Sequence, residues 1–199
     1  FDKGKRTFVQ KIKQIIIPIM YLLMVNLVLS NNRDCPENFT ANPQYPSSTP
    51  ECYPDEFVFY SSTAIAYYYF YDAELNNVDI SSEDWVGAFT CNDWDGNECI
   101  SFGTCIGTRQ WGACNSGDGC DVPVFGSDGS AYTEGYILAG EIPAFKIYDA
   151  SSNTYIGAQA SENIPWVYLD YPIINSLIAN QEIIGCTDSQ ASNYDPSAT

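Results

Sequence analysis

The sequence predicts an all-β protein, built as an antiparallel β-sandwich with disulfide-stapled loops. Short runs of aromatic and β-branched residues recur after position 56, about eight to twelve residues apart, with Gly, Asp and Ser turns between them. No stretch after residue 30 keeps the 3.6-residue period of an amphipathic helix. The chain also carries 8 cysteines in 199 residues, a density typical of exported domains that disulfides hold together.

The composition divides the chain into four segments. Residues 1–30 are a hydrophobic N-terminal segment, and residues 31–55 are an extended linker rich in Pro and Cys. Residues 56–182 form the sandwich domain, and residues 183–199 begin a short tail repeat rich in Cys, Asp and Asn.

The N-terminal segment has the features of a secretory signal peptide. Five of the 8 basic residues fall in the first thirteen positions, and the apolar run Ile15–Leu29 follows, interrupted by Pro18 and Asn26. The run is shorter than the roughly 20 apolar residues of a membrane-spanning helix. A retained anchor and a tail that docks into a neighbouring subunit are the alternatives. A signal peptide predicts an extracellular or cell-surface location.

The remaining chain is strongly acidic. From Asn31 onward there are 3 basic residues against 24 acidic ones. Such a body repels nucleic acid phosphates and anionic lipid headgroups, which excludes nucleic acid as a partner. It suits cations or solubility in a salty exterior.

The candidate strands follow one another with short turns between them. Alternate residues of Thr63–Ala73 are apolar on both faces, so this strand is central or has a covered outer face. Residues 91–129, rich in Gly, Asp and Asn, are expected to form an irregular edge apart from one strand. The expected strands are Phe57–Tyr60, Thr63–Ala73, Val78–Ile80, Trp85–Phe89, Cys105–Trp111, Gly135–Leu138, Ala144–Tyr148, Thr154–Ala158, Trp166–Leu169 and Ile173–Leu177.

Cysteine spacing suggests three bridges. Cys114 and Cys120 bracket a tight loop, and Cys35 and Cys52 flank a proline-rich segment. Cys91, Cys99 and Cys105 should supply one bridge and one thiol, with Cys91–Cys99 favoured, while Cys186 is assigned to a partner beyond the end of the chain. Zinc is the competing interpretation, but the chain has no histidine and these spacings exceed those of zinc ligands.

Two acidic clusters are candidate calcium sites, and calcium is the one cofactor considered. Oxygen-bearing side chains alternate along the chain at Asp93, Asp95 and Asn97, beside a glycine. Asp118, Asp121 and Asp128 form the second cluster. The alternative for both is ordinary turn residues whose carboxylates bind nearby backbone amides.

Aromatic residues near the loops are candidates for glycan binding. They are Trp94, Trp111, Tyr132 and Tyr136. Tyrosines also occupy the strands of secreted β-domains for packing alone, because the ring buries apolar surface while the hydroxyl stays in contact with water. The tripeptide Asn38-Phe39-Thr40 is an acceptor sequence for N-glycosylation at Asn38.

Catalysis is not expected. The chain has no histidine, which removes the usual general base and the Ser/His and Cys/His arrangements. Nothing pairs Glu134 or Glu141 as a glycosidase would require. We therefore expect a protein that is not an enzyme.

Two stretches resemble a known kind of protein. The first resembles a β-sandwich module of large secreted surface proteins of aquatic, Bacteroidota-type bacteria. The resemblance rests on five motifs in this order: DWVGAF, CIGTRQW, CDVPVFGSDGS, EIPAFKIYDAS and Pro165-Trp166. The tail GCTDSQASNYDPSAT resembles the first half of a short repeat that often follows such modules. The resemblance implies extracellular, adhesive or structural proteins without known catalysis, surface fibres among them.

Together these observations predict a secreted structural or adhesive module. Its partners are expected to be other copies of itself or neighbouring modules, joined into a cell-surface filament by strand addition at a sheet edge. The alternative is a carbohydrate-binding module that takes surface glycans.

Overall fold

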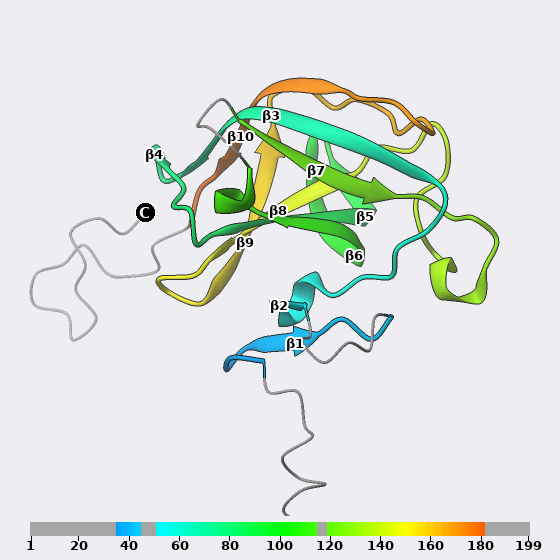
Figure 1. Cartoon of the computed structure of the whole chain (residues 1–199). Coiled ribbons are helices and arrows are strands. Elements are labelled where there is room, and N and C mark those ends of the chain that lie inside the picture. Colours follow the sequence, from blue (N-terminus) through cyan, green and yellow to red (C-terminus); the bar gives the residue numbers. More distant parts are fainter. Residues whose placement is uncertain (1–34, 45–50, 115–118, 182–199) are drawn as a thin grey trace, which may run out of the picture.

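The computed structural model describes residues 35–44, 51–114 and 119–181 (Figure 1). The expected signal peptide, Asp118, Cys186 and the tail repeat lie outside these residues. No helix within these ranges is both long and apolar enough to cross a membrane.

The described chain is an all-β fold with one large sheet that bends into two layers. The sheet order is β4-β3-β10-β9-β8-β5-β6, and β7 pairs with β3. In Figure 1, β7, β3 and β10 lie above β8, β5 and β6, and β9 joins the layers by pairing with both β10 and β8. The eight strands are β3 (Ile65–Leu75), β4 (Val78–Asp79), β5 (Trp85–Asp95), β6 (Glu98–Gln110), β7 (Cys120–Phe125), β8 (Ala144–Asp149), β9 (Thr154–Ala160) and β10 (Ile173–Ala179).

Three of the expected strands, Phe57–Tyr60, Gly135–Leu138 and Trp166–Leu169, are not strands of the sheet. Phe57 ends a short 3₁₀ turn, Asp55–Phe57, and the segment after it stays extended without pairing in a named strand. Trp166 is buried in a loop, where its indole N–H donates to the carbonyl of Val124. Gly135–Leu138 contributes only an isolated bridge, between Gly126 and Ile137. In each case burial of a large side chain produced the strand-like pattern.

The stretch after Phe89 is more regular than the sequence suggests. β5 runs on to Asp95 and β6 begins at Glu98, so residues 91–103 form a two-stranded hairpin instead of loops. β7 was not expected at all. Its proline, Pro123, lies opposite Tyr67 in the ladder with β3.

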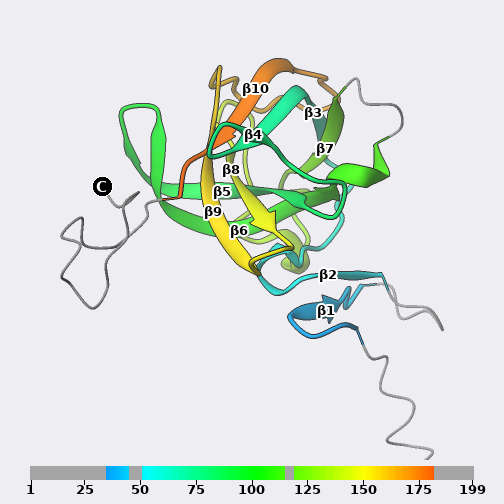
Figure 2. The same cartoon turned by 90° about the vertical axis from the view of Figure 1, so that its left-hand side faces the viewer.

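One strand pair departs from an antiparallel plan. β10 runs parallel to β3, with Ile173 opposite Tyr69 and Ala179 opposite Leu75. The connection between β9 and β10 makes this possible, because its last residues already run beside the start of β3, where the N–H groups of Tyr67 and Tyr69 donate to the carbonyls of Asp170 and Pro172. Figure 2 shows β10 lying between β3 and β9.

The core fills the space between the layers. Phe70 of β3 meets Phe145 of β8 edge to face, with ring centroids 4.9 Å apart. The buried Tyr68 hydroxyl donates to the carbonyl of Ile164, and burial raises the pKa of this hydroxyl well above its ordinary value. These contacts place aromatic side chains of β3 at the centre of the fold.

The described part of the expected linker, residues 35–44 and 51–55, is packed against the domain. β1 (Phe39–Ala41) and β2 (Cys52–Pro54) form an antiparallel pair, and the Cys35–Cys52 disulfide ties it. Phe39 packs edge to face on Trp85 and on Tyr148, at 6.2 and 5.8 Å between centroids. The pair therefore belongs to the domain, packed beneath it.

The two end strands of the sheet, β6 and β7, meet where Gly107 lies against Pro123. Gly107 has φ +157°, and a Cβ atom there would overlap the carbonyl oxygen of Pro123. Beside this crossing, the Arg109 side chain binds the backbone carbonyl and the carboxylate of Asp121, at 2.8 Å each. Close approach of the two backbones thus needs glycine at position 107.

We predict that Gly107→Ala destabilises the domain by about 2–4 kcal/mol, because the methyl group pushes β6 away from β7. Denaturant unfolding of the two proteins measures the difference. Gly157→Ala is the matched control, since its Cβ would meet only the Phe102 ring at 3.3 Å, and it should cost less than about 1 kcal/mol. Equal losses for the two variants would contradict the role of this crossing.

Candidate functional site

The candidate site begins where β5 extends beyond the start of its neighbouring strand, β8. β8 pairs with β5 from Trp85 to Phe89 and starts at Ala144, directly after Pro143. Proline has no N–H to donate to a ladder, and the chain before it turns away from β5. From Thr90 onward, the edge of β5 on this side has no paired strand among the described residues.

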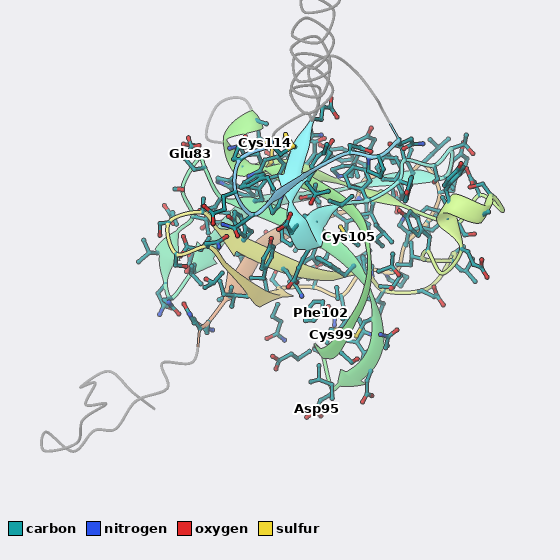
Figure 3. All side chains as sticks on the ribbon, turned by 90° about the horizontal axis from the view of Figure 1, so that it is seen from below. Glu83, Asp95, Cys99, Phe102, Cys105 and Cys114 are labelled. Carbon is teal, nitrogen blue, oxygen red and sulfur yellow. A yellow bond between two sulfur atoms is a disulfide. The ribbon has the colours of Figure 1, made fainter. Side chains whose placement is uncertain are left out.

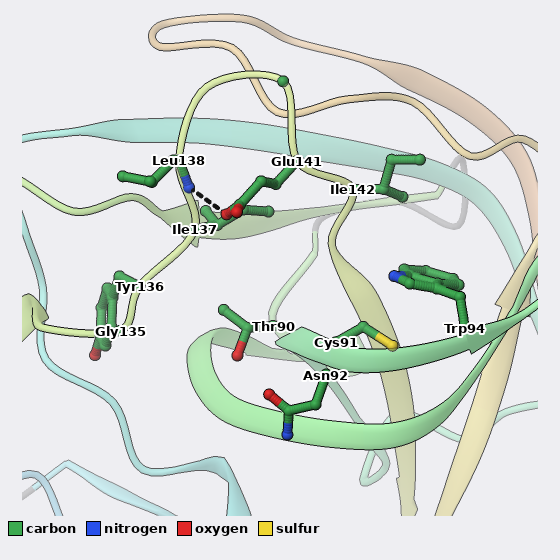
Figure 4. Close-up of a pocket in the computed structure, with 11 residues that line it drawn as sticks. Thr90, Cys91, Asn92, Trp94, Gly135, Tyr136, Ile137, Leu138, Glu141 and Ile142 are labelled. Atoms are coloured by element: carbon green, nitrogen blue, oxygen red, sulfur yellow. Dashed lines mark hydrogen bonds between the residues drawn. The ribbon is translucent and has the colours of Figure 1, made fainter.

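The space beside this edge is a groove of about 590 Å³ (Figure 4). Thr90, Asn92 and Trp94 of β5 form one wall, and the loop 135–142 forms the other. The loop is fixed from within, because the Glu141 carboxylate accepts a hydrogen bond from the Leu138 N–H at 2.8 Å. The opposite wall is thus preformed and not a free loop.

The chemistry of the groove suits recognition. Its walls combine the half-buried Trp94 and Ile142 with the amide of Asn92 and the hydroxyl of Thr90. Tyr136 lines it too, but its oxygen accepts the Tyr60 N–H at 2.7 Å, and burial raises the pKa of the Tyr136 hydroxyl to about 12. An extended chain could pair with the β5 backbone here while its side chains contact the indole.

The hairpin that carries the β5 edge is held at several points. The Cys91–Cys99 disulfide crosses its strands, and Phe102 packs on Phe89 with centroids 5.8 Å apart. The ammonium group of Lys146 lies 4.9 Å from the centre of the Phe102 ring. Figure 3 shows Asp95 at the far end of this hairpin, with Cys99 and Phe102 along it.

The three disulfides expected from cysteine spacing are all present. They join Cys35 to Cys52, Cys91 to Cys99 and Cys114 to Cys120. Cys105 is the free cysteine of the described residues; it is buried in the core, and burial raises the pKa of its thiol to about 12. Three bridges are compatible with an extracellular protein.

Asp121 and Asp128 of the second acidic cluster lie apart, and Asp118 is outside the described residues. Asp121 is the second residue of β7 and Asp128 follows the far end of that strand, about seven residues or ~23 Å of extended chain away. Asp121 is paired with Arg109. Asp128 accepts hydrogen bonds from the Thr133 hydroxyl and the Ser130 N–H, at 2.8 and 3.0 Å, which accounts for it as a turn residue.

The first cluster lies at the exposed hairpin end, with Asp93, Asp95 and Asn97 all open to solvent. A different set comes closer together: carboxylate oxygens of Asp72, Glu74 and Asp79 lie within 4.8 Å of one another. Exposed acidic groups on neighbouring strands of an acidic protein often gather without a cation, so calcium stays a prediction.

The structure separates the four candidate glycan residues. Trp94 and Tyr136 line the groove beside β5. Trp111 lines a second groove, of about 430 Å³, opposite Tyr71. Tyr132 is 68% exposed on a distant loop, with its ring 5.2 Å from that of Tyr60. Asn38 is exposed in the turn before β1.

An aromatic surface on β3 was missed. Tyr67, Tyr69 and Tyr71 project from the outer face of β3, and Tyr171 lies among them from the segment before β10. Tyr71 and Tyr171 are 53% and 51% exposed. The alternation of tyrosines in the sequence was the available signal, but it could not say which face would remain uncovered.

Comparison of the chain with family models, with curated proteins and with solved structures finds no match. The function of this chain is therefore inferred from the geometry of its grooves and surfaces.

We predict that Asp128 stabilises its turn only as a carboxylate. Its hydrogen bonds to Ser130, Thr133 and Thr63 lower its pKa, so the stabilisation is full above the ordinary carboxyl pKa of about 4 and is lost as the pH falls toward the lowered value. The melting temperature of Asp128→Asn should lie below that of the unmodified chain at pH 7, and the gap should close on acidification below about pH 4. A gap that instead vanishes on removal of calcium would assign the carboxylate to a metal.

Proposed function

We propose that the chain is a non-enzymatic structural or adhesive module of an extracellular assembly, in which copies associate by strand addition. The open edge of β5 beside the groove is the observation that carries this proposal. An unpaired edge presents backbone donors and acceptors that another extended segment can satisfy. The three disulfides support an exported protein.

The donor in this proposal is a segment from residues 1–34 of a second copy, so the proposal adopts the docking tail in place of a cleaved signal peptide. These residues hold six basic and two acidic side chains, whereas residues 35–199 hold two basic and 23 acidic ones. Both of those basic residues are already paired, Arg109 with Asp121 and Lys146 with Glu56. The acidic body therefore attracts the basic end of a neighbour, and the apolar run Ile15–Leu29 supplies side chains for the groove.

The groove has features that suit such a donor. Trp94 and Ile142 offer apolar contacts, and Asn92 and Thr90 offer polar ones. Carbohydrate binding is the second candidate for the same groove, because Trp94 stands in its wall beside polar groups.

We predict that Leu138→Arg lowers self-association of the full chain at least tenfold, because a long cationic side chain at the rim obstructs the groove and repels the basic donor. Leu138 is 56% exposed, so the fold should tolerate the change. Sedimentation velocity and electron microscopy of the full chain give the readout. Raising the salt concentration from about 0.05 M to about 0.5 M should also weaken assembly.

Val78→Arg is the matched control for this experiment, since Val78 is 67% exposed on β4, on a different part of the sheet. It should assemble as the unmodified chain does. A full chain that stays monomeric, or equal effects of the two substitutions, would contradict strand addition at β5. Groove-dependent glycan binding by a monomeric chain would favour the second candidate.

A further inference from the structure

We propose that the outer face of β3 and β10 is a binding platform for an uncharged, flat polysaccharide, at a site separate from the β5 groove. The platform consists of Tyr67, Tyr69, Tyr71, Tyr171 and Ile173, with the Arg109–Asp121 ion pair at its margin.

Strand register places these side chains on one face. Ile173 lies opposite Tyr69 in the parallel ladder, and Asp121 lies opposite Tyr69 on the other side of β3. Residues in register project to the same side of a sheet, as do alternate residues of one strand. The backbone holds Tyr171 in line, because the carbonyls of Asp170 and Pro172 accept hydrogen bonds from the N–H groups of Tyr67 and Tyr69.

The tyrosine rings form a continuous row. The ring centroid of Tyr171 lies 6.5 Å from that of Tyr67 and 6.1 Å from that of Tyr69, with interplanar angles of 37° and 31°. Tyr71 continues the row beyond Tyr69, at 5.2 Å and edge on. Three tilted rings, carried on β3 and on the segment that is hydrogen-bonded beside it, make a rigid surface longer than one sugar ring.

This surface matches the chemistry of a β-linked polysaccharide. A pyranose with equatorial hydroxyls has two faces of C–H groups that pack on aromatic rings, and its hydroxyls lie around the edge. The hydroxyls of Tyr67, Tyr71 and Tyr171 can exchange hydrogen bonds with that edge. At the margin, the Arg109 and Asp121 side chains are 31% and 35% exposed and can do the same. Exposed apolar surface of this extent commonly marks a binding site.

Charge decides between the possible occupants. Residues 35–199 carry 23 acidic side chains against two basic ones, and Arg109 at the margin is already neutralised by Asp121. Two such bodies repel each other when they meet face to face, and anionic polysaccharides are repelled too. A neutral polysaccharide incurs no such cost, so we commit to it over the acidic body of a second copy.

The test is affinity electrophoresis of the full chain through native gels that contain soluble neutral β-glucan, xylan or mannan, with alginate as the anionic comparison. At least one neutral polysaccharide should retard the protein, and alginate should not. Tyr71→Ala and Tyr171→Ala should each weaken the retardation about five- to tenfold, because each removes one stacking ring. Tyr171→Phe should keep most of it.

Tyr132→Ala is the control, because Tyr132 is even more exposed than Tyr71 and Tyr171 but lies outside the platform, on the loop after β7. It should bind as the unmodified chain does, and so should Leu138→Arg, whether or not that variant assembles. Thermal unfolding should be unchanged in all of these variants. The proposal is overturned if no neutral polysaccharide retards the chain, if alginate is preferred, if Tyr132→Ala is equally impaired, or if the platform substitutions change only the oligomeric state.

Discussion

The fold depends on the contact between its two end strands. β6 and β7 are far apart in the order of the sheet, and the bend at β9 brings them back together. Gly107 lets the backbones touch at Pro123, and Arg109 holds the same place through two hydrogen bonds to Asp121. This contact brings the edges of β6 and β7 together beside Gly107. The open edge of β5 that lines the groove belongs to the part of that strand that extends past the start of β8.

The sequence was sufficient for the class of fold and for most strands, because aromatic and β-branched runs in a chain without helical periodicity leave few alternatives. The sequence pattern was misleading where a residue is buried but does not belong to a strand. Phe57 and Trp166 are as buried as any strand residue, yet a 3₁₀ turn and a loop carry them. The sequence did not predict β7 or the parallel direction of β10, because both depend on pairing with the distant strand β3 and not on a local pattern.

Some residues of the candidate site could be predicted from the sequence, but the strand pairing that forms the groove could not. Trp94 and Tyr136 were chosen as aromatic residues near loops, and they do line one groove. What makes the groove, the departure of β8 at Pro143, is a matter of tertiary pairing. The tyrosines of β3 show the same limit of the sequence. Their alternation was visible, but only the register with β7 and β10 reveals that one face of the strand stays uncovered. Likewise, Asp121 and Asp128 are close in sequence but separated by the length of β7.

The disulfides of this chain bear on how it could mature. The bridges span 17, 8 and 6 residues, and no bridge encloses or interleaves with another. Each pair can therefore oxidise as the chain is made from its N-terminus, before later cysteines arrive to compete. Among the described residues Cys105 is the exception, because it emerges between the second and third pairs. Its protection comes from packing, because a buried and protonated sulfur is a poor nucleophile once β6 has taken its place in the core.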